Sequence, residues 1–248
     1  MRIASERDIE GLRAIGRVVA RTLAEMSAAI GPGVSTRELD QIGASALKRH
    51  GAVSAPRCVY RFPGDTCISV NEEAAHGIPG ARTLGPGDVI NIDVSAELDG
   101  YFGDTGATFV VPPDNQLKRR LLQTAEEALA RAMQAARAGA LLNGIGRAIE
   151  STAERAGFTT LRDLGSHGVG RSLHEEPRFI PNFHDPVDTR LLHDGQVITI
   201  EPFISSGSCG CRTAADGWTL ISGPGNLSAQ FEHTLVIRDG EPLVMTLP

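Results

Sequence analysis

The chain has 248 residues, with 24 Lys and Arg against 30 Asp and Glu, so its formal net charge is −6. Apolar residues make up 41% of it and charged residues 22%, a globular composition that excludes intrinsic disorder and collagen-like repeats. The acidic balance and the lack of a basic run argue against nucleic-acid binding. No stretch approaches the roughly 18 apolar residues of a membrane span, and the charged N-terminus is unlike an export signal. We therefore expect a cytoplasmic protein with no membrane partner.

The cysteines do not predict a disulfide framework or a metal site. The chain has four of them, namely Cys58, Cys67, Cys209 and Cys211. So few thiols in a chain of this length are typical of a protein from a reducing compartment. The Cys209-Gly-Cys211 sequence lacks the two-residue spacer of a zinc knuckle, so we interpret all four as ordinary thiols.

The first half of the chain predicts two helices followed by two strands. Apolar residues recur at helical spacing over residues 6–29, and Ser5 precedes them as the N-cap. Ser35-Thr-Arg-Glu38 has the form of a capping box and opens a second helix, which Gly51 ends. Two β-rich segments and the turn signal that joins them follow: Val89–Val94, Asp99-Gly100 and Tyr101–Val111.

The second half predicts the same order of elements. Helices are expected over residues 114–137 and from Asn143 to Gly157, and strands over Val197–Glu201 and Phe231–Ile237. Helices followed by strands, twice over, predict an α+β fold in which an antiparallel sheet carries helices on one face.

An internal repeat relates the two halves. Gly87-Asp-Val-Ile-Asn-Ile-Asp93 matches Gly195-Gln-Val-Ile-Thr-Ile-Glu201, at an offset of 108 residues. The segment from Gly33 to Gly51 runs parallel to the segment from Gly139 to Gly157, at an offset of 106. Two copies are too few for a solenoid. They predict one domain over residues 1–248 with pseudo-twofold symmetry and a site on the axis.

The repeat also pairs acidic residues. A hairpin centred between Leu98 and Asp99 would set Asp93 opposite Asp104, with the Cβ atoms ~4.5–5.5 Å apart. Two facing aspartates repel each other, and a bound cation removes the conflict. Glu201 matches Asp93 in the repeat, and Phe102-Gly-Asp104-Thr resembles Phe231-Glu232-His-Thr, so Glu201 and Glu232 form a second such pair. Two divalent ions neutralise four carboxylates, so the charge count favours a dinuclear metal site.

His167 lies in a glycine-rich loop and is the best histidine candidate for this site. A neutral imidazole adds nitrogen to an oxygen-rich set of ligands, which favours Mn, Fe, Co or Zn over Ca or Mg. His76 and His174 also lie in loops and remain open as candidates on the residues alone. The other histidines are interpreted as structural: His50, His184, His193 and His233.

Motifs along nearly the whole chain resemble, in order, those of type I methionine aminopeptidases. The segments that carry the resemblance are Asn71-Glu-Glu-Ala-Ala-His-Gly-Ile-Pro79, Asn91-Ile-Asp-Val94, Gly103-Asp-Thr105, His167-Gly-Val-Gly170, His174-Glu-Glu-Pro177, Ile200-Glu-Pro202 and Ser228-Ala-Gln-Phe-Glu-His-Thr234. The resemblance implies the pita-bread (creatinase/aminopeptidase) fold. It also implies a metallo-exopeptidase that uses two divalent metal ions to remove the initiator methionine from nascent proteins and peptides with a small second residue.

The resemblance implies a role for each matching residue. It gives five metal ligands, namely Asp93, Asp104, His167, Glu201 and Glu232. Glu201 also corresponds to the proton shuttle, and His76 and His174 to the histidines that contact the substrate. A monovalent-cation site corresponds to Asn71, Glu73 and Ser228.

The methionine pocket is where the sequence departs from the family pattern. The resemblance places Phe62, Val59, Leu173 and Trp218 in its wall, with Pro56 at a small position. Val59 stands where tyrosine is common, although Tyr60 is adjacent, and Leu173 stands where phenylalanine is common. One methylene in an apolar slot is worth only ~1–3 kcal/mol, so such changes can shift selectivity without loss of catalysis.

Three alternatives stay open at this point. Xaa-Pro aminopeptidases and prolidases have similar ligand sets but usually carry an extra N-terminal domain, for which helices starting by about residue 6 leave no room. Type II methionine enzymes carry a late helical insertion, whereas only 30 residues separate Glu201 from Glu232. A non-catalytic peptide-binding relative would have lost ligands that are all kept here. We expect a monomer, and we leave ribosome association open because no basic patch supports it.

Overall fold

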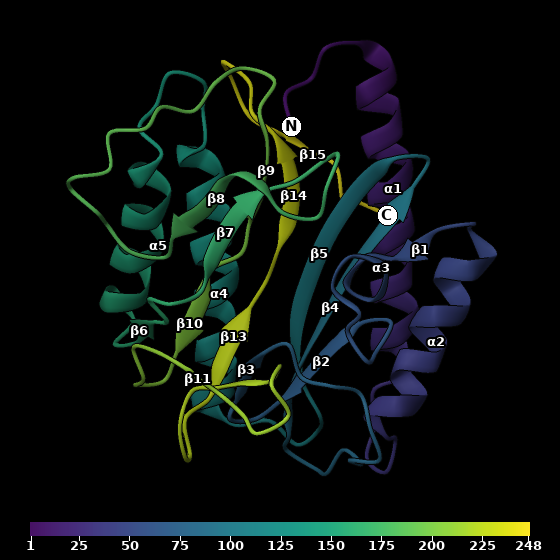
Figure 1. Cartoon of the computed structure of the whole chain (residues 1–248). Coiled ribbons are helices and arrows are strands. Elements are labelled where there is room, and N and C mark those ends of the chain that lie inside the picture. The colour runs from purple at the N-terminus through teal and green to yellow at the C-terminus, as the bar shows by residue number, and fades with distance from the viewer.

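Each half of the chain packs two long helices against an antiparallel strand pair (Figure 1). The computed structural model describes residues 1–248. The first half contains α1 (Glu6–Ala28), α2 (Thr36–Arg49), β1 (Val53–Ser54), α3 (Ala55–Tyr60), β2 (Cys67–Val70), β3 (Glu73–Ala75), β4 (Val89–Leu98) and β5 (Tyr101–Val110). The second half contains α4 (Gln116–Ala135), α5 (Asn143–Arg155), β6 (Thr159–Thr160), β7 (Gly165–Gly168), β8 (Glu175–Pro181), β9 (Val197–Ile200), β10 (Phe203–Ser205), β11 (Arg212–Thr213), β12 (Leu220–Ile221), β13 (Ser228–Gln230), β14 (His233–Val236) and β15 (Leu243–Val244).

The helix boundaries follow from capping residues that the sequence shows. Ser5 precedes α1, and its backbone N–H donates to the carboxylate of Asp8 at 3.0 Å. At α2 the capping box is reciprocal, because Glu38 N–H donates to Ser35 Oγ at 3.2 Å and Ser35 N–H donates to Glu38 Oε2 at 2.8 Å. Gly51 follows α2 with a φ of 74°, a left-handed conformation that ends helices at little cost in glycine.

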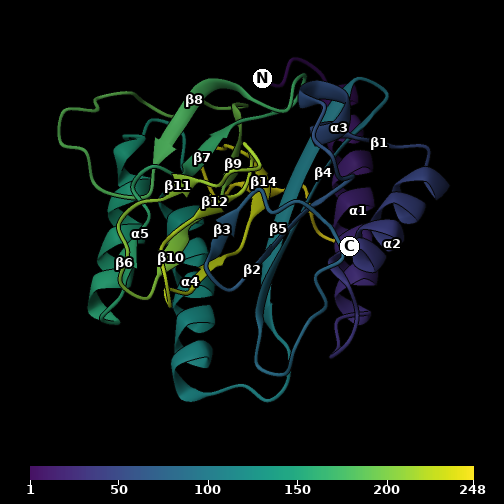
Figure 2. The ribbon, with the colours of Figure 1, turned by 60° about the horizontal axis from the view of Figure 1, so that its bottom comes forward.

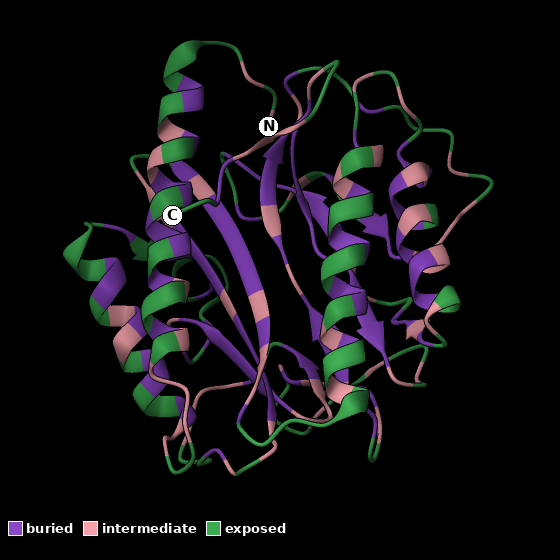
Figure 3. Ribbon diagram, turned by 180° about the vertical axis from the view of Figure 1, so that it is seen from behind, coloured by how far each residue is buried: buried purple, intermediate pink, exposed green.

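The long helices α1, α2, α4 and α5 all cover the same side of the strands, and their exposed residues face outward (Figure 3). Ile90, Ile92 and Val94 of β4 are completely buried in the cluster beneath α1 and α2. A second apolar cluster joins α4 and α5 to β9 and β14. The expected α+β architecture with helices on one face is therefore confirmed. No helix combines the length and the apolar character needed to cross a bilayer.

The sequence repeat corresponds to a structural repeat. Gly87 and Gly195, just before β4 and β9, have φ angles of 85° and 76°. Gly33 and Gly139, ahead of α2 and α5, have φ angles of 87° and 80°. The glycines of the repeat therefore make matching left-handed turns at matching places, a conformation that other residues rarely adopt.

The β4–β5 hairpin differs from the predicted register. Asp99 and Gly100 form the whole of a two-residue turn, with φ angles of 52° and 80°. Pairing is therefore shifted by two residues, and Asp93 lies opposite Gly106 rather than Asp104. The prediction of directly facing aspartates is wrong. An even shift keeps both side chains on the same face, so Asp93 and Asp104 are diagonal neighbours.

The predicted strand Phe231–Ile237 begins later than expected. β14 starts at His233, and Glu232 lies in the gap between β14 and β13, which ends at Gln230. The N–H of Glu232 donates to the carbonyl of Gly106 at 2.9 Å, so it pairs with the other half of the molecule. The β9–β14 register pairs Ile200 with His233. Glu201 follows Ile200 and Glu232 precedes His233, so the two glutamates lie close together.

The two halves meet where β5 runs beside β13 and β14, and threonine side chains complete this seam. Thr234 Oγ1 donates to the carbonyl of Asp104 at 2.8 Å and accepts from its N–H at 3.0 Å. Thr105 Oγ1 donates to the carbonyl of Glu232 at 2.8 Å. A small sheet of β3, β12 and β11 makes a further connection between the halves (Figure 2).

Two glycines of α5 provide a matched test of packing. A Cβ on Gly146 would lie 2.1 Å from the carbonyl oxygen of Phe183, whereas a Cβ on Gly144 would meet nothing within 4 Å. We expect Gly146→Ala to lower the free energy of unfolding by about 1–3 kcal/mol. Gly144→Ala should raise it by up to about 1 kcal/mol, since alanine is the better helix former. Urea unfolding of both variants measures the difference, and equal effects would contradict the packing described.

Candidate active site

A cavity of about 440 Å³ lies on the side of the strands that faces away from the long helices. Strand alternation produces it, because Ile92 and Val94 point to the helices while Asp93 between them points the other way. Both halves contribute to its wall, which consists of Pro56, Tyr60, Phe62, Cys67, Ala75, His76, Asp93, Ser95, Asp104, Asp163, Leu164, Gly165, His167, Leu173, His174, Arg178, Phe179, Glu201, Phe203 and Trp218.

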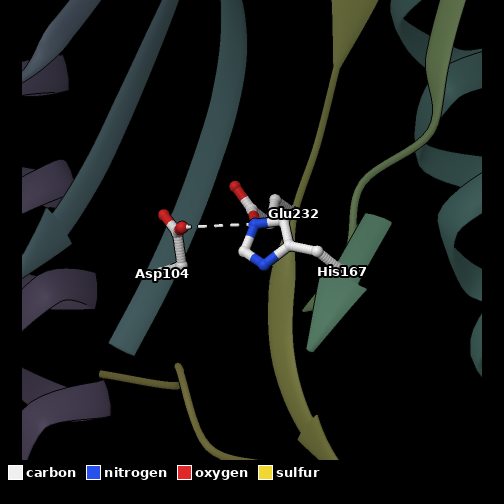
Figure 4. A group of neighbouring side chains, drawn as sticks. All are labelled: Asp104, His167 and Glu232. Carbon is white, nitrogen blue, oxygen red and sulfur yellow. Dashed lines mark ion pairs between the residues drawn. The ribbon is translucent and has the colours of Figure 1, made fainter. Parts of the chain in front are cut away.

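Three buried side chains converge at the seam between the halves. Asp104 comes from β5, His167 from β7, and Glu232 from the gap between β13 and β14 (Figure 4). Ligand atoms of all three lie within 4.8 Å of one another. Nε2 of His167 is 3.8 Å from Oδ2 of Asp104 and 3.5 Å from Oε1 of Glu201. Glu201 therefore joins the same cluster from the end of β9.

Asp93 completes the group of acidic residues. It lines the cavity beside Cys67, its partner on β2, and is the diagonal neighbour of Asp104 in the β4–β5 hairpin. The structure thus brings together all five residues that were predicted as metal ligands, although the hairpin register was wrong. Glu201 is fixed by its neighbours, since Ser166 Oγ accepts from its N–H at 2.9 Å.

The donor set fits a divalent metal. Oδ1 of Asp104 and Oε1 of Glu232 are buried without any hydrogen-bond partner, a costly state unless a cation binds them. The Nδ1 atom of His167 lies 2.9 Å from the carbonyl oxygen of Gly168, so the proton belongs on Nδ1 and Nε2 is free to bind a metal. Carboxylate oxygens with one imidazole nitrogen are typical ligands of first-row divalent ions.

The pKa shifts of these residues also fit a site for divalent metal. Burial raises the pKa of Asp93 to about 6. Burial, together with the negative charges of the other carboxylates, raises the pKa values of Asp104, Glu201 and Glu232 well above normal. Burial also lowers the pKa of His167 to about 3, which keeps its ring neutral. Divalent cations would stabilise the ionised carboxylates and leave the imidazole as a ligand.

A glutamine that the sequence reasoning did not identify orients Glu232. Gln230 Nε2 donates to Oε2 of Glu232 at 3.0 Å, and Asn91 Nδ2 donates to Gln230 Oε1 at 2.8 Å. These bonds leave Oε1 of Glu232 as the oxygen without a partner. The only feature of the sequence that could have pointed to these hydrogen bonds is that Asn91 shares a strand face with Asp93.

His76 and His174 both line the cavity. His76 has a φ of 54°, and this left-handed conformation is held by Gly77, whose N–H donates to Ser69 Oγ at 3.0 Å. The ring of His174 lies over that of His167, with centroids 4.0 Å apart. Burial lowers the pKa of His174 to about 4, so its ring is neutral at physiological pH.

The apolar part of the wall contains Phe62, Leu173 and Trp218, as predicted from the resemblance, but not Val59. The rings of Phe62 and Trp218 meet edge to face, with centroids 5.3 Å apart. Val59 is 41% exposed and does not line the cavity. Tyr60 lines it instead, because residues four apart in α3 share a face and Pro56 is the other member of that pair.

The side chains that the resemblance assigns to a monovalent cation have partners within the protein. The carboxylate of Glu73 accepts from Arg82 at 3.0 Å, and the amide of Asn71 donates to Asp88 at 2.8 Å. Ser228 is buried at the start of β13. A cation site at these residues stays a prediction.

Known proteins resemble this chain over nearly its whole length. The sequence pattern of metallopeptidase family M24 matches residues 10–239. The methionine aminopeptidase 2 of Bacillus subtilis (strain 168) is 47% identical over 247 residues, which cover 99% of each chain. The crystal structure of a methionine aminopeptidase from Thermotoga maritima is 32% identical, covers 100% of both chains and has a TM-score of 0.96.

A more distant structure shares the fold alone. The prolidase from Pyrococcus furiosus is 23% identical and has a TM-score of 0.79, and the match covers 99% of this chain but 65% of the prolidase. The pita-bread fold is therefore confirmed, and the Xaa-Pro alternative is not favoured. With a cluster suited to divalent metal and relatives of nearly equal length, the chain belongs to metallopeptidase family M24 and, within it, to the methionine aminopeptidases.

Proposed function

We propose that the chain is a dinuclear-metal aminopeptidase that removes the initiator methionine from peptides and nascent proteins whose second residue is small. The observation that carries this proposal is the position of the buried carboxylates, which lie in the same cavity as an apolar wall. Phe62, Leu173 and Trp218 offer a slot for one unbranched apolar side chain beside the reacting bond. A substrate with methionine as its first residue fits this arrangement.

The five converging side chains would hold two divalent ions, with Asp93, Asp104, His167, Glu201 and Glu232 as the ligands. Two ions neutralise the four carboxylates, and the mixed oxygen and nitrogen donors suit Co, Mn, Fe or Zn. When bound, such ions lower the pKa of a water molecule, so that hydroxide is available near neutral pH.

Three side chains then handle protons and developing charge. Glu201 takes a proton from the attacking water and returns it to the leaving amine. His174 donates a hydrogen bond to the scissile carbonyl oxygen while negative charge develops on it. His76 is placed to contact the leaving amide nitrogen. Because both halves supply these groups, we propose that residues 1–248 act as one catalytic domain. We further propose that this domain works as a monomer in the cytoplasm.

A small set of peptides tests the proposal. We expect release of methionine from Met-Ala-Ser, and no cleavage of Pro-first or Ala-Pro peptides, because only the first substrate fills the apolar slot. A chelator should abolish the reaction, and Mn²⁺ or Co²⁺ should restore it. Metal content is measured beside the rate by atomic emission. Faster cleavage of Ala-Pro peptides would favour the Xaa-Pro class, and metal-loaded protein that cuts nothing would favour a peptide-binding relative.

A further inference from the structure

Tyr60 and His174 contact each other in the wall of the cavity. The hydroxyl of Tyr60 lies 2.8 Å from Nδ1 of His174, and the two rings meet edge to face with centroids 5.6 Å apart. Tyr60 ends α3, whereas His174 precedes β8 and comes 114 residues later in the chain. Nδ1 of His174 has no other hydrogen-bond partner in the protein, so the tyrosine alone directs this nitrogen while the ring stacks on that of His167.

Both partners are anchored independently of each other. The guanidinium of Arg57, on α3, forms two hydrogen bonds with Asp65, at 2.9 and 3.0 Å. The loop that carries His174 is tied to the start of α1, because Arg171 pairs with Asp8 at 2.8 Å. The carboxylate of Glu175 also accepts the backbone N–H of Arg171 and so closes this loop. The fold therefore holds in place both backbone segments that carry the contact, so only the two side chains have to orient toward each other.

The direction of this hydrogen bond follows from its chemistry. A neutral imidazole has one nitrogen that donates and one that accepts, and a phenol is a better donor than acceptor. Burial raises the pKa of Tyr60, which keeps its hydroxyl protonated. The stronger arrangement is therefore O–H of Tyr60 donating to Nδ1 of His174. In that arrangement the ring proton of His174 is on Nε2.

We propose that Tyr60 is a positioning residue for His174, which fixes the tautomer with its proton on Nε2 and so makes this N–H the donor to the scissile carbonyl. The inference rests on the proposed function, in which His174 stabilises the charge on that oxygen. Tyr60 can take this role because the helical turn of α3 directs residue 60, and not residue 59, into the cavity. The same turn leaves Val59 outside the cavity.

Tyr60→Phe keeps the ring and removes only the hydroxyl. We expect kcat on Met-Ala-Ser to fall about tenfold, the effect of one hydrogen bond, with KM changed by less than about twofold. Cys58→Ala is the matched control, because Cys58 also lies on α3 but does not line the cavity. This control should keep the original kcat. An unchanged kcat in Tyr60→Phe would overturn the proposal.

A double-mutant cycle shows whether Tyr60 acts through His174. In a His174→Asn background, Tyr60→Phe should cause no further loss of kcat. If the two losses multiply instead, the positioning role is wrong while the proposed function stands. If His174→Asn alone keeps full activity, the role of His174 in the proposed function fails, and the inference fails with it.

Nitrogen NMR reads the tautomer without any measurement of activity. Protein labelled with ¹⁵N-histidine is recorded both after chelator treatment and after loading with Zn²⁺, and the His174 signals are assigned from their loss in His174→Asn. We expect the proton on Nε2 in the original chain and a mixture of tautomers in Tyr60→Phe. A proton on Nδ1 in the original chain would overturn the proposal.

Discussion

Glu201→Gln is expected to lower kcat on Met-Ala-Ser by about 10²–10⁴-fold, the usual contribution of a group that transfers protons in the rate-limiting step. Glutamine has nearly the same shape, and the N–H of residue 201 would still donate to Ser166 Oγ, so the fold should persist. The amide cannot accept a proton from water at neutral pH. Initial rates under saturating substrate, with metal content measured in the same samples, give the effect.

Two controls test whether the fall in kcat comes from the loss of proton transfer by residue 201. Glu154→Gln removes an exposed carboxylate from α5 and should leave kcat unchanged. The far-UV circular dichroism of Glu201→Gln should match that of the original chain, which excludes unfolding as the cause. Full activity of Glu201→Gln protein that still holds metal would refute the role of Glu201 as the proton shuttle.

Removal of metal is expected to reverse the usual dependence of stability on pH. Burial raises the pKa of Asp93 from 3.8 to about 6, so the folded, metal-free protein keeps a proton that the unfolded chain releases. The folded state therefore binds more protons in this window, and the free energy of unfolding falls as pH rises from 4 to 6. The shift on Asp93 alone corresponds to about 3 kcal/mol. The raised pKa values of Asp104, Glu201 and Glu232 act in the same direction.

Thermal unfolding of chelator-treated protein between pH 5 and 7 measures this effect. About half of the Asp93 effect, roughly 1.4 kcal/mol, is lost within this range. We therefore expect Tm to fall by at least roughly 3–6 °C, since 1 kcal/mol shifts Tm by about 2–4 °C in a chain of this size. Excess Mn²⁺ should remove the fall, because metal binds the ionised carboxylates and stabilises the folded state. Asp93→Asn should flatten the metal-free profile. A metal-free Tm that stays constant or rises with pH would contradict the electrostatics of the site.

Local sequence signals predicted where helices, strands and turns lie, but not the register of every strand pair. The Ser35–Glu38 capping box and the repeated glycines fixed where helices and turns lie, because these preferences act over a few residues. The hairpin register was wrong by two residues, since the predicted pairing was centred between Leu98 and Asp99 although Asp99-Gly100 is the turn signal. The side chains still converge, because an even shift does not change the face on which a residue lies.

Contacts between distant segments are what the sequence could not show. Glu232 lies outside regular strand structure because its N–H pairs with Gly106 in the other half, and no local pattern encodes that partner. Tyr60 enters the cavity because α3 is a short helix in a segment for which no helix was predicted. Its bond to His174 spans 114 residues. Such details depend on tertiary packing, which overrides local propensity.

The seam between β5 and the segment of β13 and β14 has a consequence for the biosynthesis of the protein. Under the proposed ligand set, Glu232 is the last ligand to be translated, and it reaches the centre only when its strand docks on β5. A growing polypeptide that has not passed this residue holds an incomplete set of donors. With that ligand set, a copy of the chain that terminates before residue 232 would have no hydrolytic activity toward neighbouring proteins.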